Sequence, residues 1–173
     1  PDGFKMTIHG PNDRYINDAK IAEALAQMLN RVGIDASVET MPKAVYFKRA
    51  SRGGPNKSPE FSFMLLGWGA GSGEASSPLK ALLHTYDKSK GLGAANRGRH
   101  SDSEVDKLVQ QALATVDSDA RGNLLAKATE KAVGENYGVI PMHYQVNTWA
   151  AKKGYSYLPR TDERTIVTGL SGN

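Results

Sequence analysis

Hydrophobic and polar side chains follow three successive patterns at the start of the chain. Residues 4–8 and 34–39 alternate between apolar and polar side chains, which predicts two half-buried strands. Between them, apolar side chains recur at helical spacing over residues 21–32, with Asn17 as the predicted N-cap and Gly33 as the left-handed residue that ends the helix. The order strand, helix, strand predicts two parallel strands joined by a right-handed crossover.

The middle of the chain predicts a short helix, a buried strand and two loops. Residues 42–47 have the apolar spacing of a short helix that begins at a proline, and breaker residues over 52–59 predict a loop. Residues 61–66 are apolar on both faces, as in the central strand of an α/β sheet. Glycine then occupies every second position in residues 67–74, which predicts a loop rather than a continued strand.

Two further elements and a loop are predicted before residue 117. Residues 78–83 predict a short helix, and residues 86–100 form a glycine-rich, basic stretch typical of a long loop. The next apolar helical pattern begins after Ser101 and Glu104, which have the spacing of a capping box.

The last predicted elements are a helix and a strand. Asp117 or Ser118 caps the helix, and residues 142–149 alternate in the manner of a strand. The tail over residues 159–173 is polar and loosely patterned. Helices that alternate with strands predict a single α/β domain over residues 1–173, with a mixed, mainly parallel sheet flanked by helices.

Composition excludes several classes of protein. With 39% hydrophobic and 23% charged residues the chain should be globular, and it has no cysteine for disulfides, thiolate metal sites or a thiol nucleophile. The net charge of +4 is compatible with a stand-alone module that binds nucleic acid or another polyanion. Lysine and arginine are scattered, however, with only small groups at residues 48–52 and 97–100, so a solvated basic surface is the favoured interpretation.

Signatures of catalysis and of targeting are missing from the sequence. The four histidines are far apart without metal-ligand spacing, and the glycines at 69, 71 and 73 do not form a dinucleotide-binding fingerprint because residue 74 is Glu. No phosphate-binding loop or nucleophile elbow occurs. We therefore expect a binding protein without cofactor or metal rather than an enzyme. The chain begins without a signal-peptide pattern, and we expect it to be a piece of a longer protein.

Three segments, in this order, carry a resemblance to a known family. They are residues 17–34, which contain Asn17-Asp18-Ala19 and Val32-Gly33-Ile34; residues 60–69, which end in Gly67-Trp68-Gly69; and residues 96–144, which contain Ser101 to Val109, Asp117, Arg121 and Ile140-Pro141-Met142-His143-Tyr144. Together they resemble the C-terminal lobe of family 5 extracytoplasmic solute-binding proteins, the dipeptide, oligopeptide and nickel type that feeds ABC importers.

The resemblance implies a fold, partners and a location. The fold would be one lobe of a type II periplasmic binding protein, which captures a small peptide or peptide-like polar solute in a cleft between two lobes. The partners would be the solute, the missing N-terminal lobe and the membrane permease of an ABC importer. The location would be periplasmic or extracytoplasmic, with membrane association through the transporter.

The leading site candidate is the loop over residues 67–74, because ligands bind beyond the carboxyl ends of strands in α/β sheets. Its candidate ligand-binding residues are Trp68, Gly69, Gly71, Ser72 and Glu74. Glycines allow a ligand to approach the backbone closely, and Trp68 offers a flat apolar wall with one N–H donor. The alternative is that Trp68 caps the core and the glycines only permit a tight turn.

The same loop departs from the family pattern at two charged positions. The resemblance implies an Asp three residues after the tryptophan, which pairs with the ligand's α-ammonium, and in oligopeptide binders an Arg three residues before it. These positions are Gly71 and Leu65 in this chain. A peptide is therefore the ligand that the family implies rather than one deduced from the residues, and Glu74 could replace the acid only if the loop folds it inward.

Secondary candidates lie outside this loop. Asn96 and Arg97 could hydrogen-bond a carboxylate or another polar group, although an ordinary solvated loop is the alternative. The semi-polar face of the last strand, formed by His143, Gln145, Asn147 and Trp149, could line the cleft or be covered by a helix or by the missing lobe. Asp106 and Asp117 suit local capping and packing. We expect the chain alone to fold but to bind weakly or not at all.

Overall fold

The computed structural model describes residues 3–71, 73–160, 162 and 164–172. The chain divides into two compact units, Pro1–Ile140 and Pro141–Asn173. No helix of the described residues is long and apolar enough to cross a membrane.

The first unit begins with the predicted βαβ arrangement. Strand β1 (Lys5–Pro11) pairs in parallel with β2 (Asp35–Met41), and helix α1 (Asp18–Arg31) connects them. Gly33 has a φ of +90°, so the predicted left-handed residue is confirmed at the end of α1. The apolar side chains that face α1 form one core cluster of Ile8, Ala22, Ala26 and Ala36.

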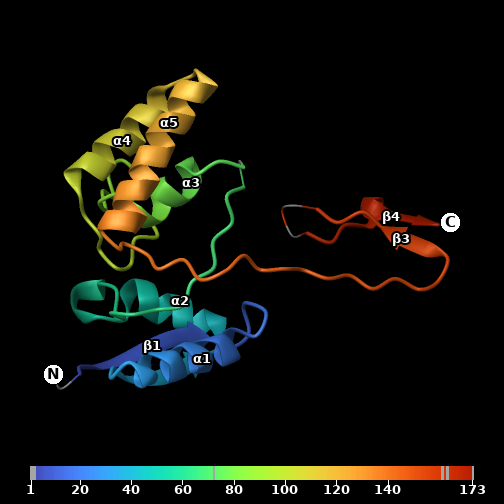
Figure 1. Ribbon diagram of the computed structural model, residues 1–173, viewed down its shortest axis with the longest axis horizontal. Helices are drawn as coiled ribbons and strands as arrows, with labels where there is room; N and C mark the ends of the chain where they lie inside the picture. Colours follow the sequence, from blue (N-terminus) through green and yellow to red (C-terminus); the bar gives the residue numbers. More distant parts are fainter. Residues whose placement is uncertain (1–2, 72, 161, 163, 173) are drawn as a thin grey trace. The chain divides into compact units, whose positions relative to one another are not determined.

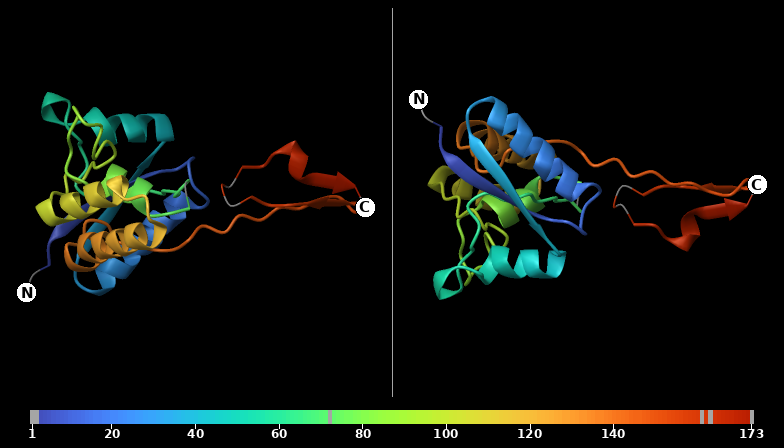
Figure 2. Two further views of the ribbon diagram at one scale, coloured as in Figure 1. Left: turned by 90° about the horizontal axis from the view of Figure 1, so that it is seen from above. Right: turned by 90° about the horizontal axis from the view of Figure 1, so that it is seen from below.

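Helix α2 (Lys43–Arg52) covers the other face of these strands, so that α1 and α2 flank the sheet (Figures 1 and 2). A second cluster of Met41, Tyr46, Ala50 and Phe61 lies between α2 and the strands. The predicted strand over 61–66 is reduced to one parallel bridge between His9 and Met64. Its backbone contacts are the bonds from His9 N to Phe63 O and from Leu65 N to His9 O, at 3.0 and 2.8 Å.

The second half of this unit is helical apart from the connection between Leu83 and Ser103. Helix α3 (Ser76–Pro78) continues into a wider π turn at Leu79–Leu83, and α4 (Ser103–Ala114) packs along α5 (Ser118–Thr129), which ends in a second π turn at Glu130–Glu135 (Figure 1). These helices share the largest core cluster, which contains Leu79, Leu83, Val105, Val109, Ala112, Leu125, Ala128 and Ala132. The predicted α/β fold, a mixed, mainly parallel sheet flanked by helices, is confirmed in its class, with β1 and β2 as the parallel strands.

Two predicted helix caps differ from the structure. Asn17 occupies the N-cap position of α1 with a φ of +57°, and its side chain makes no capping bond. For α4 the N-cap is Asp102 instead of Ser101, because the Asp102 carboxylate accepts bonds from Glu104 N and Val105 N. The prediction for α5 is confirmed, since Asp117 accepts a bond from Ala120 N at 2.8 Å.

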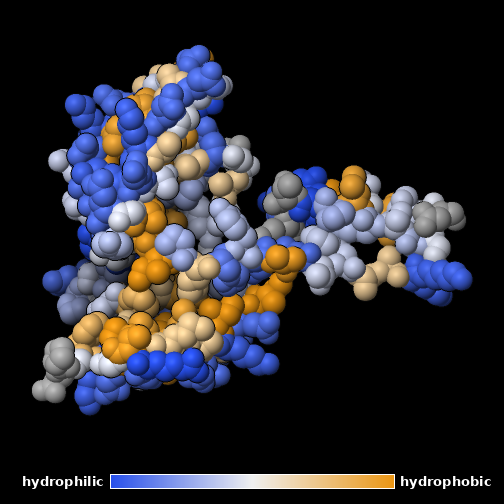
Figure 3. Space-filling model, in the orientation of Figure 1, coloured by the Kyte–Doolittle hydropathy of each residue, from blue (hydrophilic) through white to orange (hydrophobic). Residues whose placement is uncertain are grey.

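Apolar surface remains exposed at the amino-terminal edge of the β1–β2 layer. Figure 3 shows hydrophobic surface over the region of β1 and α1. Exposed apolar side chains there include Phe4, Met28 and Val32, which are 62%, 59% and 74% exposed. This edge is opposite the carboxyl ends of the strands, where the 67–74 loop lies.

The second unit contains one small antiparallel sheet. Strands β3 (Tyr155–Tyr157) and β4 (Leu170–Gly172) pair with each other, and a 3₁₀ turn at Val167–Gly169 precedes β4. The predicted strand over residues 142–149 is wrong as a sheet element, because this stretch forms no strand in the structure. Its residues make no backbone hydrogen bond within the described part of the chain, and a strand requires such a partner.

Candidate functional site

The 67–74 loop packs against the segment that follows β1. The Tyr15 hydroxyl donates a hydrogen bond to the Gly67 carbonyl at 3.3 Å. A Cβ atom on Gly67 would lie 2.6 Å from Cε1 of the Tyr15 ring, so only glycine fits this approach without a shift. The loop therefore starts at the carboxyl end of the parallel strands, as predicted, and rests on Tyr15.

Beyond Gly67 the loop is open. Trp68 is 45% exposed, which favours an indole that faces solvent or a ligand over one that caps the core. A Cβ atom added to Gly69 or Gly71 would meet no atom within 4 Å, so the backbone of both residues is approachable. Gly73 has a φ of +76° and closes the turn. Ser72, also a candidate, lies outside the described residues.

Glu74 is not folded toward Trp68 as a free carboxylate. It accepts hydrogen bonds from Ser76 Oγ at 2.7 Å and from Arg121 Nε at 3.0 Å. The bond from Ser76, together with the bond and charge of Arg121, lowers the pKa of Glu74. An open groove along α5 begins at this ion pair, with Ala75, Leu125 and Thr129 among the residues that line it. Glu74 thus ties the loop to α5.

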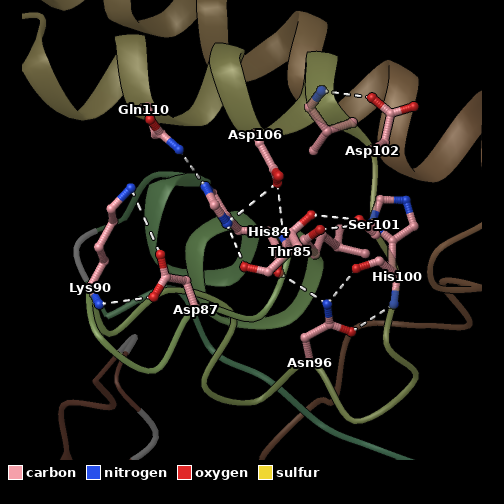
Figure 4. Close-up of polar contacts among 12 residues, drawn as sticks. His84, Thr85, Asp87, Lys90, Asn96, His100, Ser101, Asp102, Asp106 and Gln110 are labelled. Carbon is pink, nitrogen blue, oxygen red and sulfur yellow. Dashed lines mark hydrogen bonds and ion pairs between the residues drawn. The ribbon is translucent and has the colours of Figure 1, made fainter.

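Asn96 is buried, with 3% of its surface exposed, and its side chain is occupied. Its amide nitrogen donates to His84 O at 3.0 Å and to His100 O at 2.7 Å, and its oxygen accepts from His100 N at 3.0 Å (Figure 4). These bonds close the loop over residues 86–100. Asn96 therefore shapes the loop that carries Arg97 and has no free donor to offer a ligand.

A polar network centred on His84 supports the same loop from α4 (Figure 4). His84 Nδ1 lies 2.7 Å from Thr85 O and 3.3 Å from an Asp106 carboxylate oxygen, which also accepts from Thr85 N at 2.8 Å. His84 Nε2 lies 2.9 Å from Gln110 Nε2. Asp106 is used in this network, in agreement with its predicted role in packing.

Arg97 extends from the loop toward α2. Its Nε donates to Ser51 Oγ at 3.1 Å, and its guanidinium lies 5.5 Å from the centre of the Phe47 ring. Its two terminal nitrogens have no partner within the described part of the chain. A planar guanidinium held at Nε and on one face is well prepared to bind a carboxylate.

Tyr46 connects Arg97 to the candidate loop. The buried Tyr46 hydroxyl donates to Leu65 O at 2.7 Å, two residues before Gly67. Burial raises the pKa of Tyr46 far above its ordinary value; the nearby Tyr15 raises it further and Arg97 opposes the shift. Tyr15 and Arg97 therefore both lie close enough to influence the Tyr46 hydroxyl. This hydroxyl connects the region of Arg97 with the start of the 67–74 loop.

The candidates on the last predicted strand are in the second unit. There Gln145 Nε2 donates to Asn147 Oδ1 at 3.0 Å, and Trp149 Nε1 donates to Thr165 Oγ1 at 2.9 Å. His143 is exposed. These residues belong to a different unit from Trp68, and whether they line a cleft stays a prediction.

Tyr15 and Tyr46 belong to the site although the sequence did not predict them there. Only the close approach at Gly67 and the bond to Leu65 O reveal them, and no spacing in the sequence signals either contact.

No group of His, Asp or Glu side chains among the described residues could hold a metal ion.

Comparisons with known proteins bear on this geometry. No protein-family profile matches the chain. The chain is 25% identical over 162 residues to the probable D,D-dipeptide-binding periplasmic protein DdpA of Escherichia coli. This match covers 92% of the chain and 30% of DdpA. It is 29% identical over 148 residues to the periplasmic oligopeptide-binding protein OppA of Haemophilus influenzae, covering 81% and 24%. The chain resembles the peptide-type solute-binding family, as predicted.

A solved structure extends the resemblance to the fold. HbpA2 from Haemophilus parasuis superposes over the whole chain with a TM-score of 0.76 and 21% identity, and the chain covers 33% of that structure. The chain has the fold of one lobe of a type II periplasmic binding protein. It spans about a quarter to a third of the length of these three proteins.

Proposed function

We propose that the chain forms one wall of a solute-binding cleft in a two-lobed extracytoplasmic protein that serves an ABC importer. The observation that carries the proposal is the exposed Trp68 on an open glycine loop at the carboxyl end of parallel strands. Such loops are where α/β sheets bind ligands, and the relatives are named as binding proteins rather than enzymes. Binding would be non-covalent, with no catalytic step.

The proposed ligand contacts are Trp68, the backbone at Gly69 and Gly71, Ser72, and the Arg97 guanidinium. Glu74 and Asn96 act as positioning residues. Ser76 and Arg121 donate hydrogen bonds to the Glu74 carboxylate, and the Asn96 side chain is bonded to backbone groups. In both side chains the polar atoms already have partners within the chain, so neither is proposed to contact the solute directly.

The proposed solute is a small peptide or a peptide-like polar molecule, the class that the names of both relatives indicate. An ammonium group would not be held at the position of Gly71, which has no side chain, and Glu74 is paired with Arg121. A buried cation requires a paired charge. The solute is therefore expected to be anchored through groups other than a free amino terminus.

The proposed partners include a second lobe and a membrane permease, with a location in the periplasm or another extracytoplasmic space. In the second unit, Tyr144 and Val146 are 98% and 77% exposed. The polar residues that alternate with them, Gln145 and Asn147, are partly buried. Apolar side chains on the more exposed side support a protein partner there. The relatives do not favour the alternative of a nucleic-acid-binding module.

The test uses the complete reading frame that contains this chain. We expect native mass spectrometry of the secreted protein to reveal a bound small solute, and calorimetry to measure its affinity. Trp68→Ala should weaken binding about tenfold or more, because aromatic anchors dominate binding energy. Phe4→Ala, which truncates an exposed aromatic ring at the opposite edge, should leave binding unchanged. Equal affinities of the two variants would contradict the proposal.

A further inference from the structure

Two basic segments that are far apart in the sequence meet in the first unit. Arg97 Nε donates a hydrogen bond to Ser51 Oγ at 3.1 Å, which holds the loop over residues 86–100 against α2. Figure 2 shows this loop beside α2 in both views. The small basic groups at residues 48–52 and 97–100 therefore belong to one surface of the protein.

This surface contains the chain's excess of positive charge. Residues 43–60 and 86–100 contain nine lysines and arginines but only two acids, Glu60 and Asp87. The whole chain has a net charge of +4, so its remaining residues are net negative. We call the surface formed by residues 43–60 and 86–100 the basic face. Its charge gives the molecule a side that attracts anions.

Both acids of the basic face already have partners. Glu60 accepts a hydrogen bond from Arg49 Nε at 3.0 Å, and this interaction lowers the pKa of Glu60. Asp87 accepts a hydrogen bond from Ser89 Oγ at 2.6 Å, which lowers the pKa of Asp87, and it lies 3.8 Å from Lys90 Nζ. These two carboxylates therefore offset the charges of Arg49 and Lys90 and leave the other cations of the face unbalanced.

The unbalanced cations point into solvent. On α2, Lys48 and Arg52 are four residues apart and share one side of the helix, opposite the buried Tyr46 and Ala50. Five cations of the basic face are exposed and have no carboxylate partner within the part of the chain that the structure describes: Lys48, Arg52, Lys57, Lys88 and Arg99. Water and mobile ions are their neighbours, so these charges are available to an external anion.

The side chains of this face favour a broad anionic surface over a protein partner. Protein interfaces are depleted of lysine and depend on aromatic anchors. The three aromatic residues of the basic face are not free to act as anchors, because Tyr46 is buried, Phe47 is half-buried beneath Arg97, and Tyr86 lies 4.3 Å from the Arg99 guanidinium. A lipid surface needs no anchor, since its anionic headgroups attract every cation within a Debye length, about 8 Å at physiological ionic strength.

We propose that the basic face binds the anionic headgroups of a phospholipid bilayer. The proposal rests on the proposed function, which puts the protein next to a membrane permease, and adds the lipid surface as a direct partner. Binding is reversible and sensitive to salt, because it depends on exposed charges. Arg97 joins the two halves of the face, and its proposed contact with a solute is a separate role.

The test is sedimentation of the 173-residue chain with phospholipid vesicles at low ionic strength. Vesicles of phosphatidylcholine mixed with phosphatidylglycerol should bind the chain, and vesicles of phosphatidylcholine alone should not. The double variant Lys48→Gln/Arg52→Gln should bind the mixed vesicles about tenfold to thirtyfold more weakly. Arg99→Gln should weaken binding about threefold to fivefold, because each cation near an anionic surface contributes a factor of this size.

The matched control is Lys20→Gln/Arg31→Gln. It removes one exposed lysine and one exposed arginine from α1, which lies on the other face of the sheet (Figure 2). It should bind the mixed vesicles as the parent does. Circular dichroism of each variant checks that a loss of binding is not a loss of the fold.

Three results would overturn the proposal. They are equal binding to the two kinds of vesicle, equal effects of the two double variants, and binding to heparin without binding to the mixed vesicles, which would indicate a free polyanion as the ligand. The experiment contains no solute, so none of these results decides the proposed function. Conversely, loss of solute binding in Trp68→Ala would leave the vesicle result unchanged.

Discussion

Gly67 and Gly69 lie two positions apart in the candidate loop, but only Gly67 faces a neighbouring ring. Gly67→Ala should destabilise the chain by about 1–3 kcal/mol, because the new methyl group overlaps the Tyr15 ring. Gly69→Ala meets open space at an ordinary φ and should stabilise it by up to about 1 kcal/mol by restricting the unfolded chain. Urea unfolding of both variants measures the difference. Equal effects would show that the Tyr15 ring leaves room for a side chain at position 67.

Asn96 offers a second comparison at the residue scale. Asn96→Ala removes the bonds of a buried side chain to three backbone groups of His84 and His100 and should cost about 2–4 kcal/mol of unfolding free energy. Asn123→Ala, at an exposed position inside α5, should change stability by no more than about 0.5 kcal/mol. A neutral Asn96→Ala variant would indicate that the side chain serves a ligand and not the loop.

Some single residues were predictable from the sequence and others were not. Gly33 was, because a helix end that needs positive φ is a local requirement and glycine meets it cheaply. The role of Asp18 was not, because its carboxylate binds backbone groups before the helix and leaves Asn17 without a capping bond. Tyr15 was missed because its partner, Gly67, is far away in the sequence.

At the scale of single elements, the cap of α4 should make stability depend on pH. The bond from Val105 N, with those from Asn136 and Glu104 N, lowers the pKa of Asp102 below its usual value of 3.8. The carboxylate therefore stabilises the fold above pH 3.8, and this contribution is lost as pH falls through the lowered pKa. In acid titrations monitored by circular dichroism, the advantage of the parent over Asp102→Asn should shrink in that range.

Asp119→Asn is the control for this titration, since it removes a carboxylate from the first turn of α5 that makes no hydrogen bond among the described residues. Its difference from the parent should vary less with pH. If both variants follow the same curve, the effect belongs to overall charge and not to the cap.

Element prediction succeeded where the partner was local. The βαβ pattern was sufficient because β1, α1 and β2 are consecutive and contact one another. The 61–66 segment kept one bridge to β1, and the 142–149 segment kept none, although both had strand-like patterns. The alternation of apolar and polar residues shows which side chains of a strand share a face. It does not show whether a partner strand is present to form the hydrogen bonds of a sheet.

At the scale of the whole molecule, the hydrophobic core found among the described residues belongs to the first unit. The three clusters seen there lie before residue 140. A chain that ends at Ile140 should keep the unfolding free energy of the full chain within about 1 kcal/mol, as measured by urea titration. Limited proteolysis should cut first in residues 141–154, and a large stability loss on truncation would show that the second unit supports the first.

The stretch over residues 141–151 has a consequence for the chain in concentrated solution. Its backbone N–H and C=O groups are unpaired among the described residues, and Met142, Tyr144 and Val146 line one side. An extended segment of this kind is a template on which another copy can add a strand. Self-association should therefore begin at residues 141–151 while the folded core is intact. Turbidity in a concentrated sample would then report strand pairing between copies of the chain rather than unfolding.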